Sequence, residues 1–240
     1  MKKVLITGSG RRIGKELVKL FKKNSWEVII NYNISKESAY NLYNEIKESG
    51  YNCYIFKADL TNEIEVEETF KQCFEEFGVP DVLINNAGVF PPKTKLENID
   101  TKLLNNVFSL NTFSLIHTSK VFAKYAKPNS KIINIISIGG LQIWDNRIAY
   151  NISKASSIQL NKALARELAP NITVNAVNPG FIILEEDNET DIKPIALTKI
   201  PINRYGNVKD IFDAVYFFAT SSNYITGQHI NVDGGYTDCY

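Results

Sequence analysis

A tyrosine followed four residues later by a lysine can place a phenol and an ammonium group on one face of a helix. The chain contains this pattern three times, at Tyr43/Lys47, Tyr150/Lys154 and Tyr205/Lys209. Only Tyr150 and Lys154 lie at the start of a long segment with helical character, from Ile148 to Ala169. We interpret the other two pairs as surface coincidences, and Tyr150 and Lys154 as the candidate chemical pair.

A phenol with a reference pKa of about 10 is a poor proton donor at neutral pH. A neighbouring ammonium group stabilises the phenolate and lowers the pKa of the phenol toward the working range. We therefore expect Tyr150 to act as a proton donor, with Lys154 beside it.

A glycine-rich turn near the start of the chain has the features of a phosphate-binding site. The apolar run Val4–Thr7 leads into this turn, and an amphipathic segment follows it. Glycines let the backbone approach a ligand, and the free N–H groups and dipole of a helix start favour an anion. The residues predicted to contact the cofactor here are Gly8, Gly10, Arg11, Arg12, Ile13 and Gly14.

The end of the second predicted strand bears on which cofactor binds. The dinucleotide-binding rule asks for an acidic residue there, to hold the ribose 2′-hydroxyl of NAD, yet no carboxylate appears before Glu37. Groups that can donate to a 2′-phosphate are present instead, so NADP(H) is favoured. The residues concerned are Asn31, Asn33, Arg11, Ser35 and Lys36. For Arg11 and Lys36, an ordinary role as solvated surface charges stays an alternative.

Short β-rich runs alternate with longer segments of helical period along the chain. This alternation predicts an α/β protein with a single-domain Rossmann fold, in which a doubly wound, mostly parallel β-sheet carries helices on both faces. No repeat or linker divides the chain, so one domain over residues 1–240 is expected. The predicted strands are Val4–Thr7, Glu27–Asn31, Asn52–Lys57, Val82–Ile84, Lys131–Ile136 and Thr173–Val177.

The least regular stretch of the sequence runs from Glu185 to Lys199. It is acidic at first, then contains Pro194, and its hydrophobic periodicity is weak. A mobile loop beside a site and an ordinary surface excursion both fit this pattern.

Composition and charge argue against several functional classes. The 240 residues are 44% hydrophobic and 22% charged, as in a soluble globular protein with a sizeable core. A net charge of +1 argues against a nucleic-acid-binding protein, and no run approaches the roughly 20 apolar residues of a membrane span. Three cysteines without paired spacing indicate reduced thiols and a cytoplasmic protein. His117 and His229 lack neighbouring ligands, so no metal site is expected.

Taken in order, these motifs resemble those of the short-chain dehydrogenase/reductase family, whose glycine turn reads Thr-Gly-x-x-x-Gly-x-Gly. Thr7, Gly8 and Gly14 match that turn, whereas Arg12 stands at its middle glycine. The resemblance covers essentially the full length of the chain. It implies an NADP(H)-dependent oxidoreductase acting on a small-molecule substrate, and a homo-oligomer, most simply a tetramer.

The resemblance also implies roles for individual residues. Ser137 would orient and polarise the substrate oxygen, and Lys154 would also hold the nicotinamide ribose. Asn111 matches the asparagine of a water-linked proton path, although Asn105 and Asn106 lie close to it in the sequence. Further cofactor contacts are implied for Asp59 and Leu60 at the adenine, for Asn86, Ala87 and Gly88 after the fourth strand, and for Pro179, Gly180 and Ile182 beside the nicotinamide.

The substrate is the least specified part of the prediction. Arg12 and Phe90 match an arginine and a phenylalanine of pteridine reductases, in which the aromatic ring stacks on a flat pterin. Gly88 and Ser137 depart from that pattern, because those enzymes carry a serine and often an aspartate at the matching places. Trp144 either lines the substrate pocket or packs as a core aromatic residue.

Three functional hypotheses therefore remain. The leading one is an NADPH-dependent reductase of a small carbonyl or pterin-like C=N substrate. The alternatives are a 3-oxoacyl thioester reductase of fatty-acid synthesis and a catalytically silent nucleotide-binding protein with the same fold. The intact set of Asn111, Ser137, Tyr150 and Lys154 argues against the silent protein.

Overall fold

Seven strands form one sheet in the computed structural model, which describes residues 1–184, 187 and 195–239. The strand order is β3-β2-β1-β4-β5-β6-β7, and every pair of neighbours is parallel. The strands are β1 (Lys3–Ile6), β2 (Glu27–Tyr32), β3 (Cys53–Lys57), β4 (Val82–Asn85), β5 (Ser130–Ile135), β6 (Ile172–Pro179) and β7 (His229–Val232). The predicted α/β fold with a parallel sheet is confirmed.

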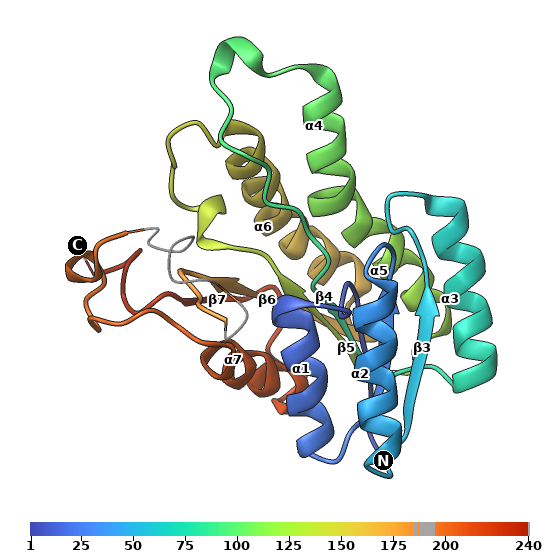
Figure 1. Cartoon of the computed structure of the whole chain (residues 1–240). Coiled ribbons are helices and arrows are strands. Elements are labelled where there is room, and N and C mark those ends of the chain that lie inside the picture. Colours follow the sequence, from blue (N-terminus) through green and yellow to red (C-terminus); the bar gives the residue numbers. More distant parts are fainter. Residues whose placement is uncertain (185–186, 188–194, 240) are drawn as a thin grey trace.

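Helices cover both faces of this sheet (Figure 1). One face packs against α1 (Arg12–Lys23), α2 (Lys36–Glu48) and α7 (Val208–Thr220). The other packs against α3 (Glu63–Phe77), α5 (Ser114–Tyr125) and α6 (Ile148–Leu168). At the top of Figure 1, α4 (Thr101–Phe108) stands beside α6, and a π-helical turn, η2 (Ser109–Phe113), joins α4 to α5. Short 3-10 turns are η1 (Leu96–Asn98), η3 (Ile138–Gly140) and η4 (Leu197–Lys199).

The strands read as continuous apolar runs because both faces of the sheet are buried. In β1, Val4 and Ile6 belong to the core under α1, α2 and α7, whereas Leu5 belongs to the core on the opposite face. The helices bury only one side each. In α1, for example, Leu17 and Phe21 lie four residues apart and are both fully buried.

The direction of strand addition reverses between β1 and β4. From β1 the sheet grows to β2 and β3 on one side, and from β4 it grows to β5, β6 and β7 on the other. The loops that follow β1 and β4 therefore leave in opposite directions and open a crevice at the carboxyl ends of the strands. This is where the glycine turn and the Asn86-Ala87-Gly88 segment lie.

The six predicted strands are confirmed, with ends that differ by one or two residues, and so is the long helix that begins at Ile148. Sequence reasoning missed β7. This strand has only four residues, all of them half-buried, and polar and apolar side chains alternate along it. For the predicted loop 185–199, residues 185–186 and 188–194 lie outside the described part of the chain. Its last residues form η4.

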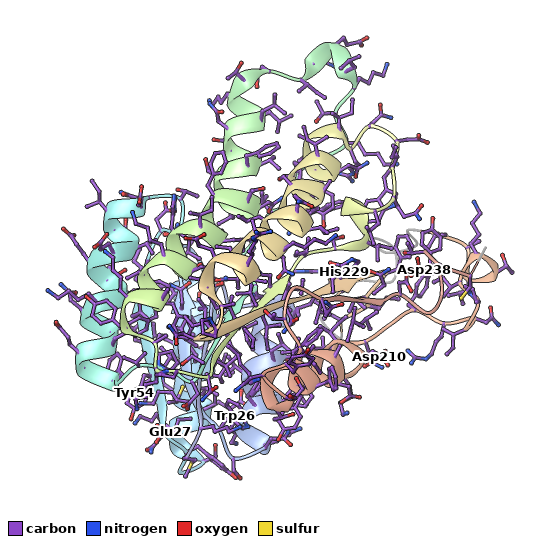
Figure 2. The ribbon with its side chains drawn as sticks, turned by 180° about the vertical axis from the view of Figure 1, so that it is seen from behind. Trp26, Glu27, Tyr54, Asp210, His229 and Asp238 are labelled. Atoms are coloured by element: carbon purple, nitrogen blue, oxygen red, sulfur yellow. The ribbon has the colours of Figure 1, made fainter. Side chains whose placement is uncertain are left out.

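The amino ends of the strands are closed by charged and aromatic side chains. Lys3 Nζ lies 3.4 Å from a Glu27 carboxylate oxygen and 5.1 Å from the centre of the Tyr54 ring. Lys2 Nζ lies 5.5 Å from the centre of the Trp26 ring. Trp26, Glu27 and Tyr54 gather at the lower edge of Figure 2, well away from His229 on β7. In the described ranges, no helix combines the length and the apolar character needed to cross a membrane.

Candidate active site

A cleft of ≈ 1180 Å³ lies at the carboxyl ends of the strands, around the point where strand order reverses. Its size suits a dinucleotide together with a small substrate. Most of the residues predicted from the sequence line it. They are Gly8, Arg11, Arg12, Ile13, Gly14, Asn31, Asn33, Ser35, Asp59, Leu60, Asn86, Ala87, Gly88, Phe90, Ser137, Trp144, Tyr150, Lys154, Pro179, Gly180 and Ile182.

Three predicted site residues, Gly10, Lys36 and Asn111, are not part of the cleft lining. Gly10 lies against the start of α2, where a Cβ would collide with Ser35 and where its carbonyl accepts a hydrogen bond from Ser38 Oγ at 2.5 Å. Lys36 is exposed at the start of α2. Cofactor contacts by Gly10 and Lys36 stay predictions.

Asn111 lies outside the cleft lining, but it hydrogen-bonds to Val89, which lines the cleft. It lies in the π-helical turn between α4 and α5, a kind of turn that is often found at functional sites. Its side-chain amide accepts from Val89 N at 2.8 Å and donates to Val89 O at 3.0 Å and to Ser153 Oγ at 3.1 Å. A Cβ on Gly88 would lie 3.2 Å from Asn111 Oδ1 and 3.4 Å from Lys154 Nζ. Glycine at this position therefore lets both side chains pack closely against the same stretch of backbone.

The glycine turn packs against the loop after β4 with no space to spare. A Cβ on Gly14 would lie 2.5 Å from Asn86 Nδ2, and a Cβ on Gly8 would lie 2.9 Å from Ala87 Cα. Gly8 also has a φ of +58°, a conformation that glycine adopts without strain. The packing of the fold therefore requires glycine at both positions, whether or not a ligand binds there.

Arg12, which replaces the middle glycine of the family turn, retains a glycine-like backbone. Its φ is +51°, which costs a residue with a Cβ on the order of 1 kcal/mol. Its Nη1 donates to Asp187 Oδ1 at 2.7 Å, and the carboxylate of Asp187 is only 6% exposed. The arginine therefore joins the glycine turn to the segment after β6. A contact with cofactor phosphates stays a prediction.

The end of β2 contains a buried donor without a partner. Asn31 Oδ1 accepts a hydrogen bond from Gly8 N at 3.2 Å, while Asn31 Nδ2 is buried and pairs with no atom of the described residues. Such a group is costly unless a ligand or water satisfies it. Because Asn31 lines the cleft at the place expected for the adenosine ribose, this amide fits a nucleotide cofactor.

Asp59, at the end of β3, presents a charged acceptor to the same part of the cleft. Burial acts to raise its pKa, but hydrogen bonds from Thr61 and Asn33 outweigh burial and hold the pKa below its ordinary value. The Thr61 amide and hydroxyl donate to Asp59 Oδ1 at 2.9 Å and 2.7 Å. Asp59 is therefore an ionised, fixed acceptor, as adenine recognition through an amino group requires.

Tyr150, Lys154 and Ser137 meet at the centre of the cleft. Tyr150 lies in the first turn of α6 and is 8% exposed, and Lys154 follows one turn later and is 5% exposed. The Ser137 hydroxyl hydrogen-bonds to Tyr150 and accepts from Gly139 N at 3.0 Å. A Cβ on Gly139 would lie 2.7 Å from Tyr150 Cε1, so a glycine is needed for η3 to pack this closely.

Burial dominates the protonation of the central pair. It raises the pKa of Tyr150, although the hydrogen bond from Ser137 and the charge of Arg147 act in the opposite direction. It lowers the pKa of Lys154 to about 8. The upward direction for Tyr150 differs from the lowering expected from a neighbouring ammonium alone, because desolvation of the phenolate is the larger effect.

The other tyrosine–lysine pairs and the histidines have structural contacts outside this centre. Lys47 Nζ lies over the Tyr43 ring, and Tyr205 donates to Ile195 O at 2.5 Å. His117 Nδ1 lies 3.0 Å from Leu60 O, and His229 Nδ1 lies 3.0 Å from Asn178 Nδ2. Within residues 1–184, 187 and 195–239, no three histidine, cysteine or acidic side chains are grouped as a metal ion would require.

The sequence reasoning missed part of the substrate side of the cleft. Phe90 meets the Tyr150 ring edge-on, with centroids 4.6 Å apart, and Trp144 stacks on Tyr150 at 5.9 Å. Phe181 stacks on Trp144 at 5.9 Å and contacts Tyr236 at 5.1 Å. We call these five residues the aromatic wall. Phe181 lies between Gly180 and Ile182, two predicted cofactor contacts, and this position was a usable signal. Nothing in the sequence pointed to Tyr236.

Arg147 was missed as well. It lines the cleft and is the N-cap residue of α6, three positions before Tyr150. Residues three apart share a helix face, so this spacing was the available signal.

Known proteins similar to this chain share its full length. The family model described as Enoyl-(Acyl carrier protein) reductase matches residues 8–237. A 3-oxoacyl-(acyl-carrier-protein) reductase FabG of Staphylococcus epidermidis is 36% identical over 240 residues, covering 98% of each chain. A short-chain dehydrogenase/reductase structure from Serratia marcescens is 28% identical, with a TM-score of 0.89 and 98% of both chains covered. A metagenomic blue fluorescent protein in complex with NADPH is 27% identical, with a TM-score of 0.90, covering 98% of this chain and 97% of that one.

The chain belongs to the short-chain dehydrogenase/reductase family. It is an NAD(P)-dependent oxidoreductase that acts on carbonyl or hydroxyl groups. Similar structures hold NADPH, NADP or NAD⁺, so the choice of cofactor has to be argued from the residues of this cleft.

The buried Lys154 makes a pH-dependent contribution to stability. Below about pH 8 the folded protein holds a buried ammonium, whereas between pH 8 and the unfolded pKa of about 10.4 only the unfolded chain binds that proton. The penalty for burying the charge is therefore present below pH 8 and is relieved as the pH rises. Relative to wild type, Lys154→Met should be most stabilised below pH 8 and should lose roughly 3 kcal/mol of that advantage by pH 10.4.

Urea unfolding of both proteins at intervals from pH 7 to 10.5 measures this difference. Lys162→Met, which changes an exposed lysine of the same helix, is the matched control and should follow wild type at every pH. Parallel stability curves for Lys154→Met and wild type would contradict the assignment of a perturbed Lys154.

Proposed function

We propose that the protein is an NADPH-dependent reductase that transfers hydride to a small carbonyl compound or a pterin-like C=N bond, with Tyr150 as the proton donor. The observation that carries this proposal is the convergence of Tyr150, Lys154 and Ser137 in one cleft with the glycine turn. A catalytically silent nucleotide-binding protein would have no need to keep a lysine buried beside a phenol.

When bound, the cofactor would supply the hydride, while the protein orients the substrate and moves the proton. Ser137 would hydrogen-bond the same carbonyl oxygen that Tyr150 protonates, and the effect of its hydroxyl on the pKa of Tyr150 supports this role. Lys154 Nζ lies 5.8 Å from the centre of the Tyr150 ring, and its ammonium stabilises the phenolate that remains after proton donation. Asn111 holds the Gly88 loop and, through Ser153, the helix that carries both residues.

NADP(H) is favoured over NAD(H) by the end of β2. The residue at the position of the expected acid is Asn31, whose buried Nδ2 lacks a protein partner among the described residues. Arg11 is exposed on the lining of the same cleft, within the glycine turn. An amide donor and a guanidinium attract a 2′-phosphate, whereas a carboxylate would repel it.

Cofactor preference can be measured by titrating NADPH and NADH into the purified protein and following nicotinamide fluorescence. NADPH should bind more tightly, and Asn31→Asp should weaken NADPH selectively because it places a negative charge beside the 2′-phosphate. Asn44→Asp adds the same charge at an exposed position of α2 outside the cleft lining, and it should leave both affinities unchanged. Tighter binding of NADH by wild type would overturn the assignment.

Tyr150→Phe should reduce turnover by at least 10²-fold and leave NADPH affinity nearly unchanged, because it removes a proton donor but leaves the glycine turn intact. Lys154→Ala should lower both turnover and NADPH affinity. Initial rates of NADPH oxidation and fluorescence titrations give the two quantities. Full activity of Tyr150→Phe would rule out the proposed proton donor.

Two substrate classes are supported by different observations. The aromatic wall offers ring faces and edges to a flat substrate, and Phe90 is 54% exposed at its rim. The relatives at 36% identity are 3-oxoacyl-(acyl-carrier-protein) reductases, which favours a 3-oxoacyl thioester. A flat C=N or diketone compound is the first candidate, and the thioester is the second.

An NADPH-oxidation screen with dihydropterins, quinonoid compounds, diketones and a 3-oxoacyl thioester distinguishes these classes. If the wall selects flat substrates, Phe90→Ala should lose roughly 2- to 10-fold in kcat/KM on flat heteroaromatic compounds, as expected for one aromatic contact. Phe90→Leu is the control for side-chain bulk. Efficient thioester reduction that is indifferent to both substitutions would establish the second candidate.

Residues 1–240 are proposed to form one NADP-binding domain of a cytoplasmic homotetramer. The three cysteines are unpaired, which suits a reducing compartment. Phe113 at the end of η2, Ile116 on α5 and Ile152 on α6 are each at least 40% exposed. These elements are neighbours, and their exposed apolar side chains suit contact with a second copy of the chain.

Light scattering at micromolar concentration should therefore give a multiple of the 27.1 kDa monomer mass. Ile116→Glu, which charges this surface, should shift the distribution toward smaller species. Phe217→Glu changes an exposed aromatic residue on α7 and serves as a comparison. A 27.1 kDa species alone for the wild-type protein would contradict the oligomer.

A further inference from the structure

Arg147 has contacts that the proposed proton transfer has not used. Its guanidinium lies over the Phe90 ring, with Cζ 4.0 Å from the ring centre, and its Nη1 donates to the carbonyl of Pro91. Phe90 in turn meets Tyr150 edge-on. The arginine is thus held on the rim of the cleft by two independent contacts, one with a π face and one with a backbone carbonyl.

Arg147 and Tyr150 lie close together in the chain at the start of α6. Arg147 is the N-cap residue of α6, and Tyr150 is the third residue of the helix, so both lie within its first turn. The positive end of a helix dipole already favours an anion at this place. The guanidinium of Arg147 adds a full positive charge to the partial positive charge of the helix end. This charge acts to lower the pKa of Tyr150.

Arg147 and Lys154 differ in how long they keep their charge. Burial lowers the pKa of Lys154 to about 8, so its ammonium is lost as the pH rises through that value. Burial also lowers the pKa of Arg147, but a guanidinium is not deprotonated in proteins under working conditions. Of these two cations, Arg147 is therefore the one that keeps its positive charge above pH 8.

We propose that Arg147 is a positioning residue for the reaction: it holds a permanent positive charge beside Tyr150 and stabilises the phenolate independently of Lys154. The inference rests on the proposed role of Tyr150 as proton donor. It assigns to this chain two cations around one phenol, of which one titrates and the other does not.

Several elements pack around Tyr150 and bring groups that bear on its ionisation. Its own helix contributes Lys154 and Arg147, and the end of β5 contributes the Ser137 hydroxyl. The loop after β4 contributes Phe90, and the segment before α6 contributes Trp144, both through their rings. Burial, the Ser137 hydroxyl and Arg147 act on the pKa of Tyr150, and Arg147 is the charged group among them.

The test measures ionisation of the phenol directly, without a substrate. 3-Fluorotyrosine is incorporated at position 150 of the full-length protein, and its ¹⁹F resonance is followed from pH 6 to 11. Arg147→Gln should raise the pKa of the fluorinated phenol by roughly 0.5 to 1. Arg147→Lys, which retains the charge but loses the planar stack, should stay close to wild type.

Two further variants distinguish an effect of the charge from an effect of altered folding. Arg147→His keeps a planar ring over Phe90 and is neutral where the fluorophenol titrates, so it should raise the pKa as Arg147→Gln does. Lys162→Gln removes one exposed positive charge from the same helix and should leave the titration unchanged. Circular dichroism and thermal unfolding confirm that each variant is folded.

The possible results separate this inference from the proposed function. An unchanged pKa of the fluorinated phenol in both Arg147→Gln and Arg147→His would overturn the role of the charge. An equal rise of this pKa in Arg147→Lys would overturn it as well, because the effect would then be purely structural. Because the measurement needs no turnover, it stays informative if Tyr150→Phe proves active. In that case, the proton donor would be wrong while the charge on Tyr150 could still be demonstrated.

Discussion

The cleft depends on the close approach of two backbone segments, the turn after β1 and the loop after β4. Thr7 Oγ1 accepts hydrogen bonds from Asn86 N and Ala87 N at 2.9 Å and 3.1 Å, and a Cβ on Gly8 would collide with Ala87. These two segments directly follow β1 and β4, the paired strands between which the strand order reverses. The pairing of the strands therefore holds the two segments together. The positions of the glycine turn and of the Gly88 loop, and through Asn111 that of α6, follow from this contact.

At the centre of the cleft, burial opposes charge. Desolvation favours a neutral phenol at Tyr150 and a neutral amine at Lys154, while Ser137, Arg147 and the start of α6 favour the phenolate. Burial is the larger effect, so a ligand that brings positive charge or hydrogen-bond donors to Tyr150 would shift its ionisation toward the phenolate. The aromatic wall contributes to the balance, because it removes water from Tyr150 and offers a ring on which Arg147 rests.

Much of this arrangement could be predicted from the sequence, because it depends on local patterns. Alternating apolar runs and helical periods predicted six of the seven strands, and the four-residue spacing placed Tyr150 and Lys154 on one helix. What could not be predicted depends on tertiary packing. The short, half-buried β7 has no periodic signature, Tyr236 reaches the aromatic wall from the far end of the chain, and the net direction of the Tyr150 pKa follows from burial.

The contacts that define the cleft also join distant parts of the polypeptide. Thr7 and Asn86 hydrogen-bond across 79 residues, and Arg12 reaches Asp187 across 175. Closing loops of this length costs chain entropy before the contacts compensate for it, which slows folding. The cleft is complete only when segments from distant parts of the chain are all in place. Any ligand that binds there selects fully folded chains, and it therefore protects the whole polypeptide against unfolding and proteolysis.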